Sequence, residues 1–161
     1  MTDNMIVEWD DRYLIGIPLI DDQHKELIRL TNALYESCLQ GDEAARESFK
    51  IAIQGTVDYV KFHFSAEERV LQNVNYPEFA VHKKQHEEFV KQILEEVKAF
   101  EEGKKFVPNV FVRFLRDWIL THIAMADKKY AAYIIHLKKN GALKTKEDFS
   151  KLKPSVVSLM F

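Results

Sequence analysis

Residues 63–86, HFSAEERVLQNVNYPEFAVHKKQH, decide the fold, because they join two helical segments through one short turn. His63 lies four residues before Glu67, and His82 lies four residues before His86. Positions four apart share one face of an α-helix, with about 6 Å of axial rise between them. Residues 73–77 contain the turn signals between the two pairs. The stretch therefore predicts an antiparallel helix pair that gathers four potential metal ligands at one end.

Three further potential ligands lie on either side of this hairpin. His24 precedes it, and His122 follows it with Asp127 five residues later. A spacing of five turns the carboxylate by about 140° around a regular helix, so we expect a locally widened, π-like turn between His122 and Asp127. Buried imidazoles need partners. Five histidines and two acidic residues at these spacings predict a di-iron site.

The apolar periodicity of the rest of the chain predicts an all-α fold. We expect helices from 21 or 22 to 40, from 42 to 72, from 77 to 103 and from 108 to 140, after an extended N-terminal arm of residues 1–20. Short connections favour an up-down-up-down four-helix bundle over residues 1–141. Residues 142–161 are expected to form a short C-terminal extension that packs on the bundle, with docking or dimerisation as the alternative.

Composition narrows the class of protein further. The 161 residues are 47% hydrophobic and 30% charged, as expected for one soluble domain. A net charge of −2 indicates no nucleic-acid partner. No stretch reaches the roughly 20 apolar residues of a membrane helix. Because Cys38 is the single cysteine and residues 1–8 do not resemble a signal peptide, we expect a cytoplasmic protein.

The ligand set leaves room for one external molecule. Two six-coordinate metal ions offer about twelve positions. Five imidazoles fill five, two bridging carboxylates fill four, and an oxo or hydroxo bridge fills two, so that one position remains. Iron suits this mixture of nitrogen and oxygen, although manganese and zinc also accept such ligands.

Several segments of the chain resemble bacterial hemerythrins over about residues 5–135. The resemblance rests on Trp9, on GIPLIDDQH ending at His24, on HFSAEE from His63, on YPEFAVHKKQH ending at His86, and on WILTHIAMAD ending at Asp127. It implies one iron bound by His82, His86 and His122, a second bound by His24 and His63, and bridging by Glu67 and Asp127. Dioxygen would bind end-on to the two-histidine iron, in a pocket lined by Leu27, Phe64, Trp118 and Leu120.

Two residues near this pattern are excluded from it. Glu68 lies five residues from His63, so helix geometry and the hemerythrin motif both favour Glu67 as the ligand, and we expect Glu68 to face solvent. His136 lies fourteen residues beyond His122. That separation is about 21 Å along a helix, so we expect His136 to serve only at the helix C-terminus.

The leading functional hypothesis is reversible, non-catalytic dioxygen binding for transport, storage or delivery. The expected partners are dioxygen and either an oxygen-consuming protein or an external reductase. One alternative is a di-iron enzyme that acts on nitric oxide or peroxide, because the same open position could accept either molecule. Another is an oxygen-sensing or iron-handling module whose C-terminal extension reports the state of the metals.

Overall fold

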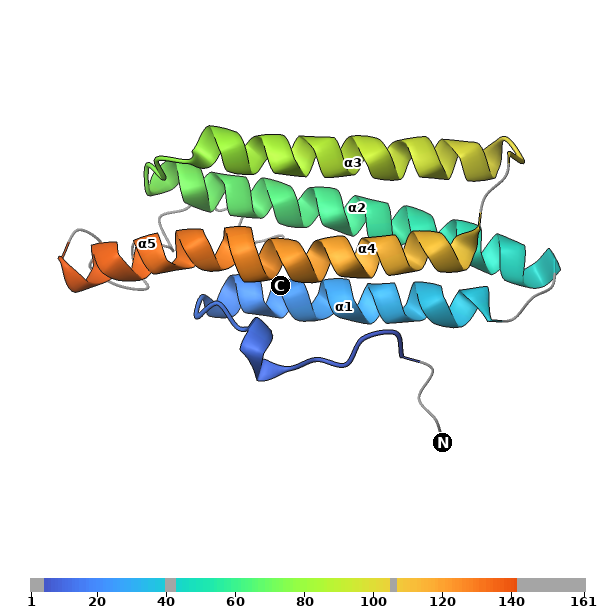
Figure 1. Ribbon diagram of the computed structural model, residues 1–161, viewed down its shortest axis with the longest axis horizontal. Coiled ribbons are helices and arrows are strands. Elements are labelled where there is room, and N and C mark those ends of the chain that lie inside the picture. Colours follow the sequence, from blue (N-terminus) through green and yellow to red (C-terminus); the bar gives the residue numbers. More distant parts are fainter. Residues whose placement is uncertain (1–4, 40–42, 105–106, 142–161) are drawn as a thin grey trace.

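The computed structural model describes residues 5–39, 43–104 and 107–141 as a bundle of four antiparallel helical rods (Figure 1). Three rods are the helices α1, Pro18–Cys38, α2, Glu43–Asn73, and α3, Phe79–Glu101. The fourth consists of α4, Pro108–His122, the π-helical segment η2, Ile123–Asp127, and α5, Lys128–Lys139. This up-down-up-down architecture confirms the predicted fold class.

The start of α1 differs from the predicted boundary. Asp21 or Asp22 was expected to open the helix, but Pro18 occupies its first turn, because a proline there has a suitable φ and lacks only an N–H that would be unpaired anyway. Asp21 instead accepts hydrogen bonds from the backbone N–H groups of Ile15, at 2.8 Å, and Gly16, at 3.2 Å. His24 consequently lies in the second turn of α1.

The other predicted boundaries lie within two residues of those observed. The predicted cap Asp42 lies outside the described residues, and α2 begins at Glu43. Pro77 and Glu78 precede α3 and do not belong to it. Residues 142–161 also lie outside the described part of the chain, so the prediction that they pack on the bundle stays a prediction. Among the described helices, none combines the length and apolar character that a membrane crossing requires.

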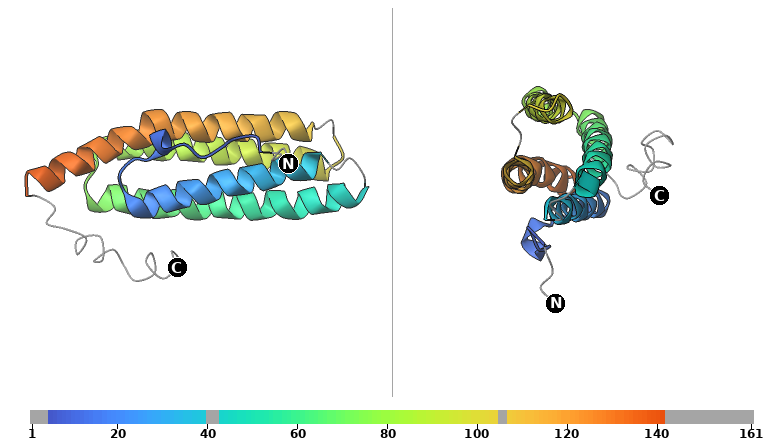
Figure 2. Two further views of the ribbon diagram at one scale, coloured as in Figure 1. Left: turned by 90° about the horizontal axis from the view of Figure 1, so that it is seen from below. Right: turned by 90° about the vertical axis from the view of Figure 1, so that its right-hand side faces the viewer.

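The hydrophobic core runs the length of the bundle and surrounds the candidate ligands. Each rod buries the apolar side of its periodic pattern, as the fully buried Leu34, Ile53, Ile93 and Leu115 illustrate. The axial view in Figure 2 shows the four rods around this interior. Polar side chains buried among such residues must be paired or bound.

The side chain of Asn32 binds residues 6 and 7 of the N-terminal arm to α1. The Asn32 Oδ1 atom accepts hydrogen bonds from the backbone of Ile6, at 3.0 Å, and Val7, at 3.1 Å, while Asn32 Nδ2 donates to the Val7 carbonyl at 2.8 Å. The prediction of an extended arm is wrong in two places. A single 3-10 turn, η1, forms at Asp11–Tyr13, and residues 18–20 belong to α1.

We expect Asn32→Ala to release this arm. The substitution leaves two backbone donors and one acceptor of the arm without their partner, at a cost of about 1–3 kcal/mol. For a chain of this size the loss lowers Tm by about 3–10 °C, measured by thermal unfolding. Gln54→Ala is the matched control, since Gln54 makes an exposed bond to Asp58 within α2. Equal Tm values for the two variants would show that the arm is held by other contacts.

Candidate metal centre

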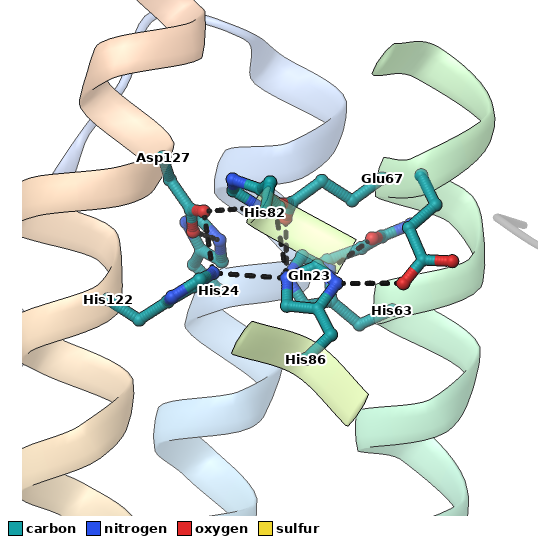
Figure 3. Close-up of polar contacts among 9 residues, drawn as sticks. Gln23, His24, His63, Glu67, His82, His86, His122 and Asp127 are labelled. Atoms are coloured by element: carbon teal, nitrogen blue, oxygen red, sulfur yellow. Dashed lines mark hydrogen bonds and ion pairs between the residues drawn. The ribbon is translucent and has the colours of Figure 1, made fainter. Parts of the chain in front are cut away.

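All seven predicted ligands lie together inside the bundle (Figure 3). Their donor atoms form two overlapping groups, within each of which all atoms lie within 4.8 Å of one another. The larger group contains His82, His86 and His122, and the smaller contains His24 and His63. Glu67 and Asp127 belong to both groups. This is the arrangement expected when two carboxylates bridge two metal ions.

The position of Asp127 depends on the π-helical segment. Residues 123–127 form η2 directly after His122, which confirms the widened turn predicted from the spacing of five. A wider turn rotates each residue by a smaller angle, so positions five apart can share a face. Asp127 therefore reaches the same buried layer as His122 and is only 1% exposed.

Imidazole nitrogens converge on the two carboxylates. Glu67 Oε1 lies 2.5 Å from His82 Nε2, and Glu67 Oε2 lies 3.0 Å from His63 Nε2. Asp127 Oδ1 lies 3.2 Å from His122 Nε2, and Asp127 Oδ2 lies 3.1 Å from His24 Nε2. Each carboxylate thus faces histidines from both groups.

Several of these close approaches are not hydrogen bonds. Glu67 Oε2, both carboxylate oxygens of Asp127 and both ring nitrogens of His24 are buried without a hydrogen-bond partner among the described residues. Unpaired buried polar atoms are rare in folded proteins. Glu67, Asp127 and His24 each contribute one of these atoms to a ligand group, as the ligands of a cation do. The donor set therefore fits a pair of metal ions held by nitrogen and oxygen.

The electrostatics of the cluster also favour bound cations. Burial lowers the pKa of His63 to about 4 and lowers the pKa of His86 well below its usual range, so both rings are neutral at pH 7 and keep a lone pair. Burial and the nearby Asp127 raise the pKa of Glu67 to about 7. Two carboxyl groups buried in one site disfavour each other's ionisation through charge repulsion, and a bound cation would offset that repulsion.

Two side chains outside the ligand set orient the histidines. The His63 Nδ1 atom lies 2.6 Å from Gln23 Oε1, and His86 Nδ1 lies 3.0 Å from Glu68 Oε1. When Nδ1–H donates a hydrogen bond to each of these oxygens, the Nε2 atom that faces the cluster carries the free lone pair. The sequence suggested that Glu68 faces solvent. In the structure α3 places His86 beside it, so Glu68 contacts a ligand residue instead. Gln23 was not predicted, although it immediately precedes His24.

Aromatic rings cover the larger ligand group. Phe64 stacks on His86 with ring centroids 3.7 Å apart, and Trp118 stacks on His122 at 4.4 Å. Tyr130 lies edge-on to His82 at 5.4 Å, and its buried hydroxyl has no hydrogen-bond partner among the described residues. Burial and the nearby Glu67 and Asp127 raise the pKa of Tyr130 well above its usual range, so the phenol keeps its proton. Tyr130 was not predicted from the sequence, although its position three residues after Asp127 would have indicated that it lies on the same side of the helix.

The four predicted oxygen-pocket residues are buried to different degrees. Leu27 and Phe64 are buried, and Trp118 packs against the core. Leu120 is half-buried and is not part of the hydrophobic core cluster, so its place in the oxygen pocket stays a prediction. The buried Ile119 and Ile123 flank His122 along the chain. His136 is exposed on α5, where its Nε2 lies 2.9 Å from Asn140 Nδ2, far from the cluster as expected.

A four-helix bundle with two overlapping groups of buried His, Glu and Asp ligands defines the class of dinuclear metal-binding bundle proteins. A family model described as the hemerythrin HHE cation binding domain matches residues 15–134. The chain belongs to the hemerythrin family.

Individual relatives agree with this assignment. A bacteriohemerythrin of Methylococcus capsulatus is 34% identical over 115 residues, which cover 71% of this chain and 86% of the relative. A hemerythrin-like protein of Naegleria gruberi is 32% identical over 122 residues, or 76% of this chain and 88% of the relative. The crystal structure of a wild-type hemerythrin superposes with a TM-score of 0.74 at 30% identity, covering 79% of this chain and 96% of the other.

Proposed function

We propose that this protein binds dioxygen reversibly at a pair of non-heme iron ions. The observation that carries the proposal is the division of the cluster into groups that contain three and two histidines and share two carboxylates. His82, His86 and His122 would hold one ion, and His24 and His63 the other. Glu67 and Asp127 would bridge the pair. The two-histidine ion would then keep one coordination position for dioxygen.

The side chains around the site support binding without turnover. Gln23 and Glu68 fix the orientation of His63 and His86, and oriented neutral imidazoles make a rigid, electron-rich ligand set. Leu27, Phe64 and Ile123 are buried beside the ligands, where they exclude water from the bound molecule. When loaded, the iron pair would supply the electrons that bind dioxygen and recover them on release.

The proposal fits a carrier that stores dioxygen or delivers it to an oxygen-consuming protein. It also requires an external electron source, because a carrier whose iron is oxidised when dioxygen departs in reduced form must be reduced again before it can bind dioxygen. The family of the relatives supports this function, and the histidine-rich ligand cluster supports it independently.

Repeated oxygenation tests the proposal directly. The reduced, iron-loaded protein should gain a visible charge-transfer band in air and lose it under argon, with most of the band recovered over several cycles. Irreversible oxidation within the first cycle would contradict a carrier function. Sustained consumption of nitric oxide or peroxide in the presence of an electron donor would instead support the enzymatic alternative. Metal analysis of the same sample would distinguish iron from manganese or zinc.

A further inference from the structure

The ligand histidines His86 and His63 each have one ring nitrogen that faces the cluster and one that faces away from it. His86 Nε2 lies 3.0 Å from His122 Nε2, so this atom faces the other ligands. His63 Nε2 lies 3.0 Å from Glu67 Oε2 and faces them too. The Nδ1 atom of each ring therefore points away from the cluster. A group that binds Nδ1 acts on the metal ion through the ring, because it changes how strongly Nε2 donates.

The two Nδ1 atoms have partners of different charge. His86 Nδ1 lies 3.0 Å from a carboxylate oxygen of Glu68. His63 Nδ1 lies 2.6 Å from the neutral amide oxygen of Gln23. His24, the other histidine of the two-histidine group, has no hydrogen-bond partner for Nδ1 in the described part of the chain. Within those residues, an anionic side chain therefore contacts the outer nitrogen of a three-histidine ligand, and none contacts the outer nitrogens of the two-histidine group.

The contact between Glu68 and His86 is partly protected from water. Phe64 stacks on the His86 ring with centroids 3.7 Å apart and planes 1° apart, and the His86 side chain is 2% exposed. Charges interact more strongly where water is excluded. Burial raises the pKa of Glu68, and the nearby Lys83 opposes that rise. The Glu68 side chain is still 21% exposed, so solvent helps to keep its carboxylate ionised.

A carboxylate bound to Nδ1 stabilises the higher oxidation state of the ion that the same ring holds. Its negative charge attracts a ferric ion more strongly than a ferrous ion. Its hydrogen bond also makes the imidazole a more basic ligand. The amide oxygen of Gln23 accepts a hydrogen bond but brings no charge. The two ions therefore differ in their electrostatic surroundings as well as in their number of histidines.

We propose that Glu68 is a positioning residue that lowers the reduction potential of the three-histidine ion through His86. This inference rests on the proposed function, because it assumes iron in both ligand groups. On reduction the ferric ion gains one electron, the Nδ1 proton stays on His86, and no bond of Glu68 forms or breaks. The carboxylate thus makes this ion a better electron donor, and dioxygen binding at the pair requires such a donor.

Glu68→Gln separates the charge from the hydrogen bond. The glutamine oxygen can still accept from His86 Nδ1, so we expect two iron ions per chain. At a fixed potential the ferrous-to-ferric ratio of one couple should rise about tenfold, the lower end of outer-partner effects. That change equals about 59 mV for one electron. Spectroelectrochemistry without oxygen at about pH 8, far above the ordinary pKa of glutamate, measures the shift.

Glu87→Gln is the matched control. It removes the same charge from the residue that follows His86, but the Glu87 side chain is 65% exposed and pairs with Lys83 at 3.9 Å. Exposed charges are screened by solvent, so we expect potentials close to those of the wild type. A shift of the same size in Glu68→Gln and in Glu87→Gln would overturn the proposal, as would no shift in either variant.

Metal substitution tests the same charge effect without electron transfer. Ga³⁺ and Zn²⁺ have the charges of ferric and ferrous ions, and neither changes its oxidation state in the experiment. In competition with a chelator, Glu68→Gln should lose about tenfold more affinity for Ga³⁺ than for Zn²⁺ relative to the wild type. Equal losses for the two ions would overturn the proposal. This measurement decides the question if the variant fails to hold two iron ions.

The results also separate this inference from the proposed function. Circular dichroism and iron content verify that each variant is folded and loaded. Reversible oxygenation of the wild type, together with an unchanged potential in Glu68→Gln, would contradict this inference alone. A shifted potential in Glu68→Gln, together with irreversible oxidation of the wild type by dioxygen, would contradict the proposed function alone.

Discussion

Glu67→Ala should abolish tight binding of both metal ions, whereas Glu68→Ala should weaken iron binding without abolishing it. Glu67 belongs to both ligand groups, and its two oxygens face His82 and His63 on different sides of the cluster. Its removal therefore takes one ligand from each ion and also removes a bridge between two like charges. Neither ion would keep enough ligands to compete with solvent.

The expected effect of Glu68→Ala is smaller and has a different cause. Glu68 accepts a hydrogen bond from Nδ1 of His86 and is not in either ligand group. Loss of such an outer partner typically weakens metal binding by about 10–100-fold. Metal analysis after gel filtration should find almost no iron in Glu67→Ala, and two ions per chain in Glu68→Ala loaded at high iron concentration. Equal iron content in the two variants would contradict the assignment of Glu67.

Removal of the metals should lower Tm by about 15–30 °C. Binding to the folded state alone stabilises a protein by about 4 kcal/mol per site when the free ligand is 1,000 times Kd, or about 8 kcal/mol for two sites. In a chain of this size each kcal/mol shifts Tm by about 2–4 °C. The metal-free protein must also keep two carboxyl groups and five imidazoles buried close together.

Thermal unfolding with and without a chelator measures this difference. The Glu67→Ala variant provides the control, since a protein that holds no iron should show the same Tm in both conditions. A chelator effect of similar size in wild type and variant would mean that the chelator acts on something other than this cluster. Unchanged Tm in the wild type would indicate that the bundle is stable without metals.

Helix periodicity allowed much of the centre to be predicted from the chain alone. The spacing of four places His63 with Glu67, and His82 with His86, on common helix faces whatever the surrounding fold. The spacing of five after His122 predicted the π-helical segment that the structure contains at residues 123–127. The place of Leu120 in the oxygen pocket stays a prediction.

The sequence by itself thus determined the four helices and which side chains point inward from each, since these follow from local backbone geometry. Only the tertiary structure decided which side chains meet across helices. The contact of Glu68 with His86, that of Gln23 with His63 and the position of Tyr130 beside His82 all depend on how neighbouring helices are rotated and offset. These contacts depend on how the helices pack against each other, which the spacing of residues within one helix does not predict.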